Sequence, residues 1–225
     1  MSIFEVIMDL PLFKGISKTH VAEFAERTQV SFRKLRDGEV LIEKEDKCSD
    51  LVYILTGEAL VSFSTPDGDF TVRQKCGRGT VIGADRLFGM YNNYGLCATA
   101  CGDLGVMSFN KEQYLNMLNS NPIYLLNMLN YLSVKNQRVI EAMSSSRKGS
   151  LLEAIALRVL VLTEPTSTDI EIQAALPVWE DLTNLREPDL AGQFERLSQE
   201  GFISVRDSNI KILSRQRLIE EAFGA

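Results

Sequence analysis

Histidine is almost absent from this 225-residue sequence, in which His20 is the only one. Most nucleophile and base pairs, and most zinc or iron sites, depend on imidazole groups. A metal-dependent enzyme built inside a β-barrel would need several such ligands, whereas His20 precedes the segment that is rich in strand-forming residues. The sequence therefore predicts a protein that is not an enzyme and that has no metal site and no resident cofactor.

Cysteine is also scarce, with four residues at Cys48, Cys76, Cys97 and Cys101. A chain of this size with four cysteines is expected to hold reduced thiols rather than a disulfide framework, which indicates the cytoplasm. Cys97 and Cys101 fall on one face of a predicted strand and could ligate a metal or form a redox pair. Buried structural thiols are the preferred interpretation. An iron–sulfur centre would need cysteines near the N-terminus, and haem or redox sensing stays open.

Long apolar runs and a secretion signal are missing as well. The run over 151–161 is interrupted by Glu153 and Arg158, and it is shorter than the roughly 20 apolar residues of a membrane helix. The N-terminal residues have no basic segment followed by an apolar one. These absences predict a cytoplasmic protein that does not bind membranes.

Positive charge is in deficit, with 24 Lys and Arg against 30 Asp and Glu and a net charge of −6. Residues 147–225 hold nine basic and thirteen acidic side chains. Nucleic-acid binding by diffuse electrostatics needs a basic face, which this balance disfavours. A basic face confined to part of the surface is still compatible with this net negative charge.

The first hundred residues change from helical to strand-like patterning. Apolar residues over 3–30 recur at helical spacing and are broken by Pro11 and Gly15, which predicts two short helices, the second with Thr19 as its cap. From 30 to 109, β-branched and aromatic residues alternate with turn residues, which predicts short strands in a jelly roll. The predicted turns are Asp37-Gly38, Gly57, Asp67-Gly68, 77–79, Gly83 and Gly102.

A long helix is predicted over 121–146, where Asn121-Pro122 provides a start. Its apolar residues recur at spacings of four and three, a pattern typical of a coiled-coil seam and hence of a homodimer. The seam positions are Leu125, Leu129, Leu132, Asn136, Val139 and Met143. Residues 144–149 are interpreted as a hinge, followed by an amphipathic helix over 151–162.

The last sixty residues predict a helix, a turn, a second helix, a hairpin and a final helix. The first helix is expected over 180–185, and Pro188 opens the second, which Gly201 ends. Strands at 202–205 and 210–213 flank a turn. Helix–turn–helix followed by a hairpin is a winged helix. The predicted fold class is α+β: a double-stranded β-helix (jelly roll) sensor domain at 1–120, a dimerisation helix at 121–146 and a winged helix-turn-helix at 147–225.

Three parts of the sequence resemble the family of the cyclic-AMP receptor protein and the fumarate–nitrate regulator, the Crp/Fnr family. Residues 37–42 with 50–59 are similar to two glycine-anchored strands of that family, 79–83 to the strand before its phosphate-binding cassette, and 195–203 to the end of its recognition helix. The resemblance spans nearly the whole chain. It implies a cyclic nucleotide-binding-like sensor domain in a homodimeric transcription regulator that binds double-stranded DNA.

The effector site departs from the family pattern. Members that bind a cyclic nucleotide carry Gly-Glu and, about ten residues on, an Arg before Ser/Thr-Ala, and these two side chains hold ribose and phosphate. Here Ala84 follows Gly83, and Leu96 precedes Cys97-Ala98, although Asp85 could be aligned with the Glu. The resemblance therefore implies an effector that is not a cyclic nucleotide and whose identity is unknown. The expected effector-pocket residues are Gly83, Ala84, Asp85, Leu96, Cys97, Ala98, Lys135 and Asn136. For Asn136, the preferred alternative is that it fixes the register of the helix seam.

The DNA-reading residues implied by the resemblance lie at the start of the second helix of the winged helix. They are Arg186, Glu187, Asp189, Gln193 and Arg196. Gln can pair with adenine, Glu or Asp with cytosine, and Arg with guanine. Glu187 and Asp189 could instead interact only with the helix dipole. The leading hypothesis is a DNA-binding regulator; the alternative is a sensor-like ligand-binding or protein-interaction module that has lost DNA binding.

Overall fold

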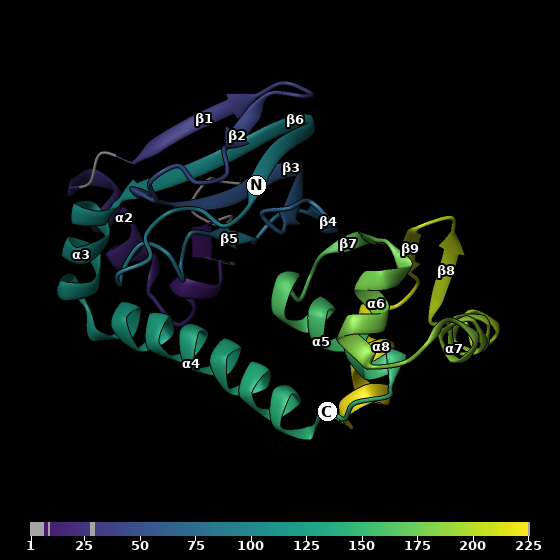
Figure 1. Ribbon diagram of the computed structural model, residues 1–225. Coiled ribbons are helices and arrows are strands. Elements are labelled where there is room, and N and C mark those ends of the chain that lie inside the picture. Colours follow the sequence, from purple (N-terminus) through teal and green to yellow (C-terminus); the bar gives the residue numbers. More distant parts are fainter. Residues whose placement is uncertain (1–6, 9, 28–29, 225) are drawn as a thin grey trace. The chain divides into compact units, whose positions relative to one another are not determined.

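The computed structural model describes residues 7–8, 10–27 and 30–224, and the chain forms two compact units (Figure 1). The N-terminal unit comprises Met1–Leu60 and Cys76–Asn136, and the C-terminal unit comprises Val61–Lys75 and Gln137–Ala225. Residues 61–75 therefore belong to the C-terminal unit, although more than sixty positions separate them from the rest of it. The sequence did not predict this assignment. The functional division at 120 and 146 stays a prediction.

The N-terminal unit is built on antiparallel strands. They are β1 (Ser31–Leu35), β2 (Val40–Ile42), the first part of β3 (Asp50–Ser64), β5 (Val81–Ile82) and β6 (Cys97–Asn110). The long strand β6 pairs with β1, where Leu35 lies opposite Leu104, and with β2, and it neighbours β3. Strand β5 pairs with β3. This antiparallel, jelly-roll-like domain confirms the predicted fold class for this part of the chain.

The predicted turn glycines have positive φ angles, but two of the predicted turns are wrong, because Gly57 and Gly102 lie within the strands β3 and β6. Gly38, Gly57, Gly68, Gly79, Gly83 and Gly102 all have positive φ angles. At Gly57, a Cβ atom would lie 2.1 Å from the backbone oxygen of Asp103. Because no side chain fits at that distance and L-residues rarely adopt φ of +76°, only glycine is compatible with the approach of β3 to β6 there.

Helices flank the strands of this unit. They are the short 3₁₀ helix η1 (Pro11–Phe13), α2 (Lys18–Arg27), α3 (Lys111–Ser120) and the first part of α4 (Pro122–Ser145). The expectation that Thr19 caps the second helix is wrong: α2 already begins at Lys18, and the Ser17 hydroxyl accepts a hydrogen bond from the backbone N–H of His20 at 3.3 Å. Residues 3–6 of the first predicted helix lie outside the described residues.

Aromatic side chains from four elements meet in the core of the N-terminal unit. The ring of Phe13 on η1 lies edge-on to Tyr124 on α4 and to Tyr53 on β3, with centroids 5.5 and 5.9 Å apart. Phe109 on β6 completes the cluster, 5.8 Å from Tyr53. Edge-to-face aromatic pairs add about 0.5–1.5 kcal/mol each to the burial of their surface. The cluster thus fixes the start of α4 on the sheet.

The C-terminal unit contains most of the elements after α4. They are α5 (Leu151–Leu162), β7 (Thr168–Ala174), α6 (Leu176–Thr183), α7 (Glu187–Gln199), β8 (Ile203–Arg206), β9 (Asn209–Ile212) and α8 (Arg215–Phe223). The predictions for α4, α5 and the β8–β9 hairpin are confirmed within a few residues. Helix α6 was expected over 180–185 but spans 176–183, because Pro177 in its first turn starts the helix earlier. Strand β7 was missed.

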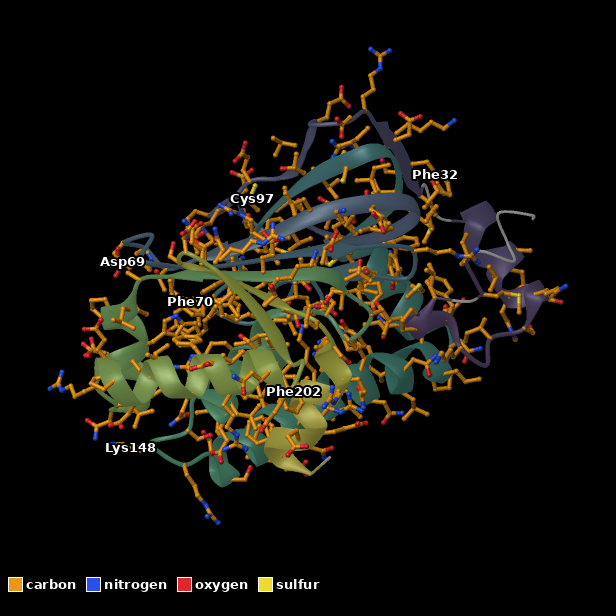
Figure 2. The ribbon with its side chains drawn as sticks, turned by 90° about the vertical axis from the view of Figure 1, so that its right-hand side faces the viewer. Phe32, Asp69, Phe70, Cys97, Lys148 and Phe202 are labelled. Carbon is orange, nitrogen blue, oxygen red and sulfur yellow. The ribbon has the colours of Figure 1, made fainter. Side chains whose placement is uncertain are left out.

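Strand β4 (Phe70–Cys76) extends the sheet of the C-terminal unit, whose strand order is β4-β7-β9-β8. β4 pairs antiparallel with β7, with Val72 opposite Ile172. The Gln74 side chain is buried, donates to the backbone oxygen of Leu162 at 3.0 Å and accepts from the backbone N–H of Glu164 at 2.8 Å. The β3–β4 hairpin therefore supplies both a strand and core residues to this unit, and Figure 2 shows Phe70 on it.

Among the described residues, no helix combines the length and the apolar character that a membrane crossing requires.

Candidate functional site

The segment 83–96, which follows β5 and is called the cassette here, begins with a strained turn. Gly83 has φ of +92°, and a Cβ atom there would lie 2.9 Å from the backbone oxygen of Asp50 and 3.0 Å from the Cys48 sulfur. The Gly83 carbonyl accepts hydrogen bonds from the backbone N–H groups of Arg86 and Leu87 at 3.1 and 2.8 Å. A glycine is thus required at the first predicted effector residue because of backbone geometry alone.

Two buried donors that sequence reasoning missed hold the base of the cassette. The Cys48 thiol lies 3.7 Å from the carbonyl oxygens of Gly83 and Asp50, and the Tyr94 hydroxyl donates to the Asp50 carbonyl at 3.0 Å. Burial raises the pKa of the Cys48 thiol and of the Tyr94 phenol. Both groups therefore keep their protons and act as donors. Nothing in the sequence around either residue signals these contacts, which join Cys48 to Gly83 across 35 positions and Tyr94 to Asp50 across 44.

The other predicted effector residues in the cassette and at the start of β6 differ in exposure. Ala84 is buried, whereas Asp85 is exposed and lies 3.5 Å from the Arg86 guanidinium. Leu96 and Cys97 are half-buried where β6 begins, and Ala98 is buried. Neither Ala84 nor Leu96 can donate or accept a side-chain hydrogen bond, so the two positions that carry polar anchors in nucleotide-binding relatives are apolar here.

Arg86, which is not among the predicted effector residues, brings a guanidinium group into the cassette. Its Nη2 atom would lie 3.3 Å from a Cβ atom on Gly95, so the group rests against the backbone just before Leu96. The two ends of the cassette therefore meet through Arg86 and Gly95. The glycine at position 83 is a sequence signal for this contact. It permits a turn in which the backbone N–H of Arg86 bonds to the Gly83 carbonyl, so that Arg86 stays close to the end of β5.

Lys135 and Asn136 lie on α4, at the end of the N-terminal unit. Lys135 is half-buried and Asn136 is exposed. In the described part of the chain, the Asn136 side chain makes no hydrogen bond. Its role as an effector contact stays a prediction, as does its alternative role in a helix seam.

An exposed apolar stripe runs along α4. The stripe includes the exposed side chains of Leu125, Leu126, Leu129, Ile140 and Met143, whose exposed fractions lie between 44% and 62%. The opposite face packs inward, with Tyr124, Met128 and Ala142 buried. The stripe contains Leu125, Leu129 and Met143 of the predicted seam, whereas Leu132 and Val139 are half-buried. The coiled coil stays a prediction.

Three of the predicted DNA-reading residues gather at the start of α7. Arg186 is the N-cap residue with its side chain 85% exposed, and Glu187 and Asp189 are exposed in the first turn. The nearest carboxylate oxygen of Glu180 is 3.9 Å from the Arg186 guanidinium. The helix start therefore presents an exposed guanidinium, at ion-pair distance from Glu180, beside two exposed carboxylates.

The other two predicted DNA-reading residues are engaged within the unit. The Gln193 amide accepts from the backbone N–H of Leu151 at 2.7 Å and donates to the Gly149 carbonyl at 3.1 Å. Arg196 donates to Glu200, one turn along α7, at 2.8 Å. Gln193 thus ties α7 to the start of α5, and the DNA-reading roles of all five residues stay predictions.

The four cysteines are free thiols, as expected. Cys48 and Cys76 are buried, Cys97 is half-buried and Cys101 is exposed. The preferred interpretation of Cys97 and Cys101 as buried thiols is therefore wrong: Cys97 is the first residue of β6, and Cys101 begins an exposed stretch of that strand over 101–103. Among the described residues, no three His, Cys, Asp or Glu side chains cluster in a way that could hold a metal ion.

Comparison with known proteins agrees with the architecture of the N-terminal unit. Residues 32–121 match the family described as "Cyclic nucleotide-binding domain". The sensor domain of the transcriptional regulator DNR from Pseudomonas aeruginosa is 19% identical, with a TM-score of 0.51 over 65% of this chain and 95% of that one. No curated protein sequence matches the chain.

Two further structures are similar at lower scores. The catabolite activator protein of Thermus thermophilus is 17% identical, with a TM-score of 0.47 over 95% of this chain and 99% of that one. A cAMP-binding acyltransferase from Mycobacterium smegmatis is 18% identical, with a TM-score of 0.47 over 62% of this chain and 41% of that one. At these identities the likeness concerns the fold alone. Residues 32–121 therefore match the cyclic nucleotide-binding domain family, and the structural likeness to Crp/Fnr-type regulators is one of fold at low sequence identity.

Proposed function

We propose that this protein is a homodimeric, DNA-binding transcription regulator whose sensor domain responds to an effector other than a cyclic nucleotide, and that it is not an enzyme. The observation that carries the proposal is the arrangement of α6, α7, β8 and β9 after a cyclic nucleotide-binding domain and a long helix. Two helices joined by a short turn and followed by an antiparallel hairpin form a winged helix, in which the second helix reads DNA.

The dimer is supported by the apolar stripe on α4. Leu129 is 51% exposed, so an aspartate there does not disturb the fold of a single chain. We expect Leu129→Asp to give monomers in analytical ultracentrifugation, because a charge in a helix seam is strongly unfavourable. Asn130→Asp, which adds the same charge at the neighbouring exposed position, should remain dimeric. A dimer that survives Leu129→Asp would overturn this part of the proposal.

DNA binding is tested by selection from a random library of double-stranded DNA with the full-length protein. We expect enrichment of a two-fold symmetric sequence, because a dimer presents two copies of α7. Arg186→Ala should weaken binding to that sequence by about tenfold, since a phosphate or guanine contact by arginine contributes about 1–3 kcal/mol. Arg33→Ala, on an exposed position of β1, is the control and should have no effect. Absence of any enriched sequence would contradict DNA reading.

The effector prediction is tested by calorimetry with cyclic AMP and cyclic GMP. We expect no heat of binding at millimolar nucleotide, because Ala84 and Leu96 leave ribose and phosphate without their usual anchors. Micromolar binding would overturn the prediction. If a cyclic nucleotide does bind, Arg86→Gln tests whether Arg86 holds its phosphate, because the Arg86 guanidinium lies against Gly95, next to Leu96.

The alternative function, a sensor-like interaction module without DNA binding, is favoured by the acidic character of the C-terminal residues. Glu187 and Asp189 follow the exposed Arg186, and the Gln193 amide bonds to the backbone of Gly149 and Leu151. The DNA selection separates the two functions: a dimer that enriches no sequence is the result that this alternative predicts.

A further inference from the structure

A cavity of about 310 Å³ lies within the C-terminal unit, where the end of α4, α5 and α8 meet. Its volume is at the lower end of the range for small-molecule sites, about 300–1,000 Å³. It lies outside the cassette and outside the start of α7, so neither of the predicted functional sites uses it. Every residue that lines it belongs to 138–223, which places the cavity inside one compact unit.

Part of the cavity lining is apolar. Ala142 on α4 and Ile219 on α8 are buried, and Leu160 on α5 and Phe223 on α8 are partly buried beside them. An apolar surface that faces an open cavity stays in contact with water, at a cost that an apolar occupant would remove. This part of the lining therefore favours a ligand with a hydrocarbon body.

Two arginines line the same cavity. Arg215, the first residue of α8, donates to the hydroxyl and to the carbonyl oxygen of Thr163 at 2.9 and 3.3 Å. These contacts use two of the five N–H donors of a guanidinium. Arg138 on α4 is exposed at the cavity. The pKa of Arg215 is lowered by burial and, to a smaller degree, by Arg138, while Glu164 opposes the shift. The two guanidinium groups are therefore close enough to repel each other.

The charge balance of the lining favours an anion of low charge. Arg138 and Arg215 face a single lining carboxylate, that of Glu141, which lies three residues after Arg138 on the same face of α4. Glu164 lies near Arg215 but outside the lining. One excess positive charge in a cavity whose lining is partly apolar matches a monoanion better than a phosphate dianion. Guanidinium groups bind carboxylates through two parallel hydrogen bonds, which no neutral head group can match.

We propose that this cavity binds a small organic carboxylate, with its head group at Arg138 and Arg215 and its hydrocarbon body against Leu160, Ile219 and Phe223. Such a ligand bridges α4, α5 and α8, and binding to the folded state alone stabilises the unit. The proposal does not depend on DNA binding or on the effector of the cassette, so it can fail while the proposed function holds.

The test is a titration of the full-length protein with hexanoate and benzoate, followed by ligand-observed NMR and by the thermal midpoint of unfolding. Hexanamide and inorganic phosphate are the control ligands. We expect both carboxylates to bind and to raise the midpoint. Hexanamide should bind at least about tenfold more weakly, because charge-assisted hydrogen bonds are roughly twice as strong as neutral ones.

Three variants with single charge changes locate the site. Arg138→Gln removes a cation from the lining and should weaken hexanoate binding about tenfold. Glu141→Gln removes the opposing carboxylate and should strengthen it by about two- to fivefold. Lys148→Gln removes an exposed cation from the same unit outside the lining and should leave the affinity unchanged. All three positions are exposed, so the fold should tolerate each change.

Opposite shifts for Arg138→Gln and Glu141→Gln, with Lys148→Gln unchanged, would establish the site. Several results would overturn it: no binding of either carboxylate up to about 20 mM, equal binding of hexanoate and hexanamide, binding of phosphate in preference to carboxylates, or equal effects of Arg138→Gln and Lys148→Gln.

Discussion

The ring of Phe70 on β4 lies edge-on to the indole of Trp179 on α6, with centroids 6.0 Å apart and an interplanar angle of 67°. Trp179 makes a second edge-on contact with Phe194 on α7, also at 6.0 Å. Three rings thus link the β3–β4 hairpin to the helix that we propose reads DNA. The hairpin falls within the sequence match to the cyclic nucleotide-binding domain, yet its buried side chains belong to the core of the C-terminal unit. Both halves of the sequence are needed to complete that core.

Truncation of the Phe70 side chain should destabilise the C-terminal unit. We expect Phe70→Ala to lower the free energy of unfolding by about 3–5 kcal/mol, because a buried phenyl group is lost and a cavity is left. Trp179 is the only tryptophan, so its emission during urea unfolding reports on this unit. Leu213→Ala, at a position 53% exposed in the same unit, should change stability by no more than about 0.5 kcal/mol. Equal effects of the two truncations would show that Phe70 is not buried as described.

A second prediction concerns the close approach of β3 to β6 at Gly57. Gly57→Ala should lower the free energy of unfolding of the N-terminal unit by about 3 kcal/mol or more, because it adds a steric clash to backbone strain. Gly38→Ala is a matched control: Gly38 has nearly the same φ, +77°, but a Cβ atom there meets nothing within 4 Å. Strain alone costs about 1–2 kcal/mol. Thermal unfolding followed by circular dichroism should therefore separate the two variants, and identical midpoints would contradict the close approach of Asp103.

Segments with strong local patterns could be predicted from the sequence. The helix over 151–162 and the hairpin formed by Ile203–Arg206 and Asn209–Ile212 follow from periodicity and turn chemistry, which act between near neighbours. Strand β7 has an alternating pattern too, but its partners β4 and β9 lie far away along the chain. A short alternating segment becomes a strand only when such partners exist, so local pattern alone did not identify it.

The candidate site was predictable only in part, for a similar reason. The apolar character of Ala84 and Leu96 could be read directly, whereas the return of Arg86 to Gly95 depends on the turn at Gly83. Gln193 was assigned to DNA from its place in a helix. Its amide in fact bonds to backbone groups 42 and 44 positions away, and no sequence pattern reports such a pairing.

The cysteines should react with a thiol reagent in an order set by exposure. We expect Ellman's reagent to modify Cys101 first and Cys97 more slowly, and to reach Cys48 and Cys76 only when the protein unfolds. The raised pKa of Cys48 slows its reaction further, because the thiolate is the reactive form. Cys101→Ser should remove the fastest phase and leave the others unchanged. Rapid modification of Cys48 in the folded protein would contradict its contact with Gly83.

The last prediction concerns acid stability through Asp169, at the start of β7. Its carboxylate accepts hydrogen bonds from the ammonium groups of Lys75 on β4, at 2.8 Å, and Lys211 on β9, at 2.9 Å. These bonds, that of Lys75 first, lower the pKa of Asp169 to about 2. A carboxylate in the unfolded chain titrates near pH 3.9, about the reference value for aspartate. Asp169 therefore stabilises the folded state above about pH 4, and this contribution is lost as the pH falls toward about 2.

Asp169→Asn keeps the shape of the side chain and tolerates the left-handed backbone at this position, where φ is +47°. The variant should have a lower urea midpoint than the unchanged protein at pH 7, followed by Trp179 emission. The difference should shrink below about pH 4 and be small near pH 2, where the folded carboxyl group is half protonated and the unfolded one almost fully protonated. Since the three side chains are partly exposed, about 1 M salt should also reduce the difference at pH 7. A difference that stays constant from pH 7 to pH 2 would show that Asp169 acts through backbone conformation rather than through its charge.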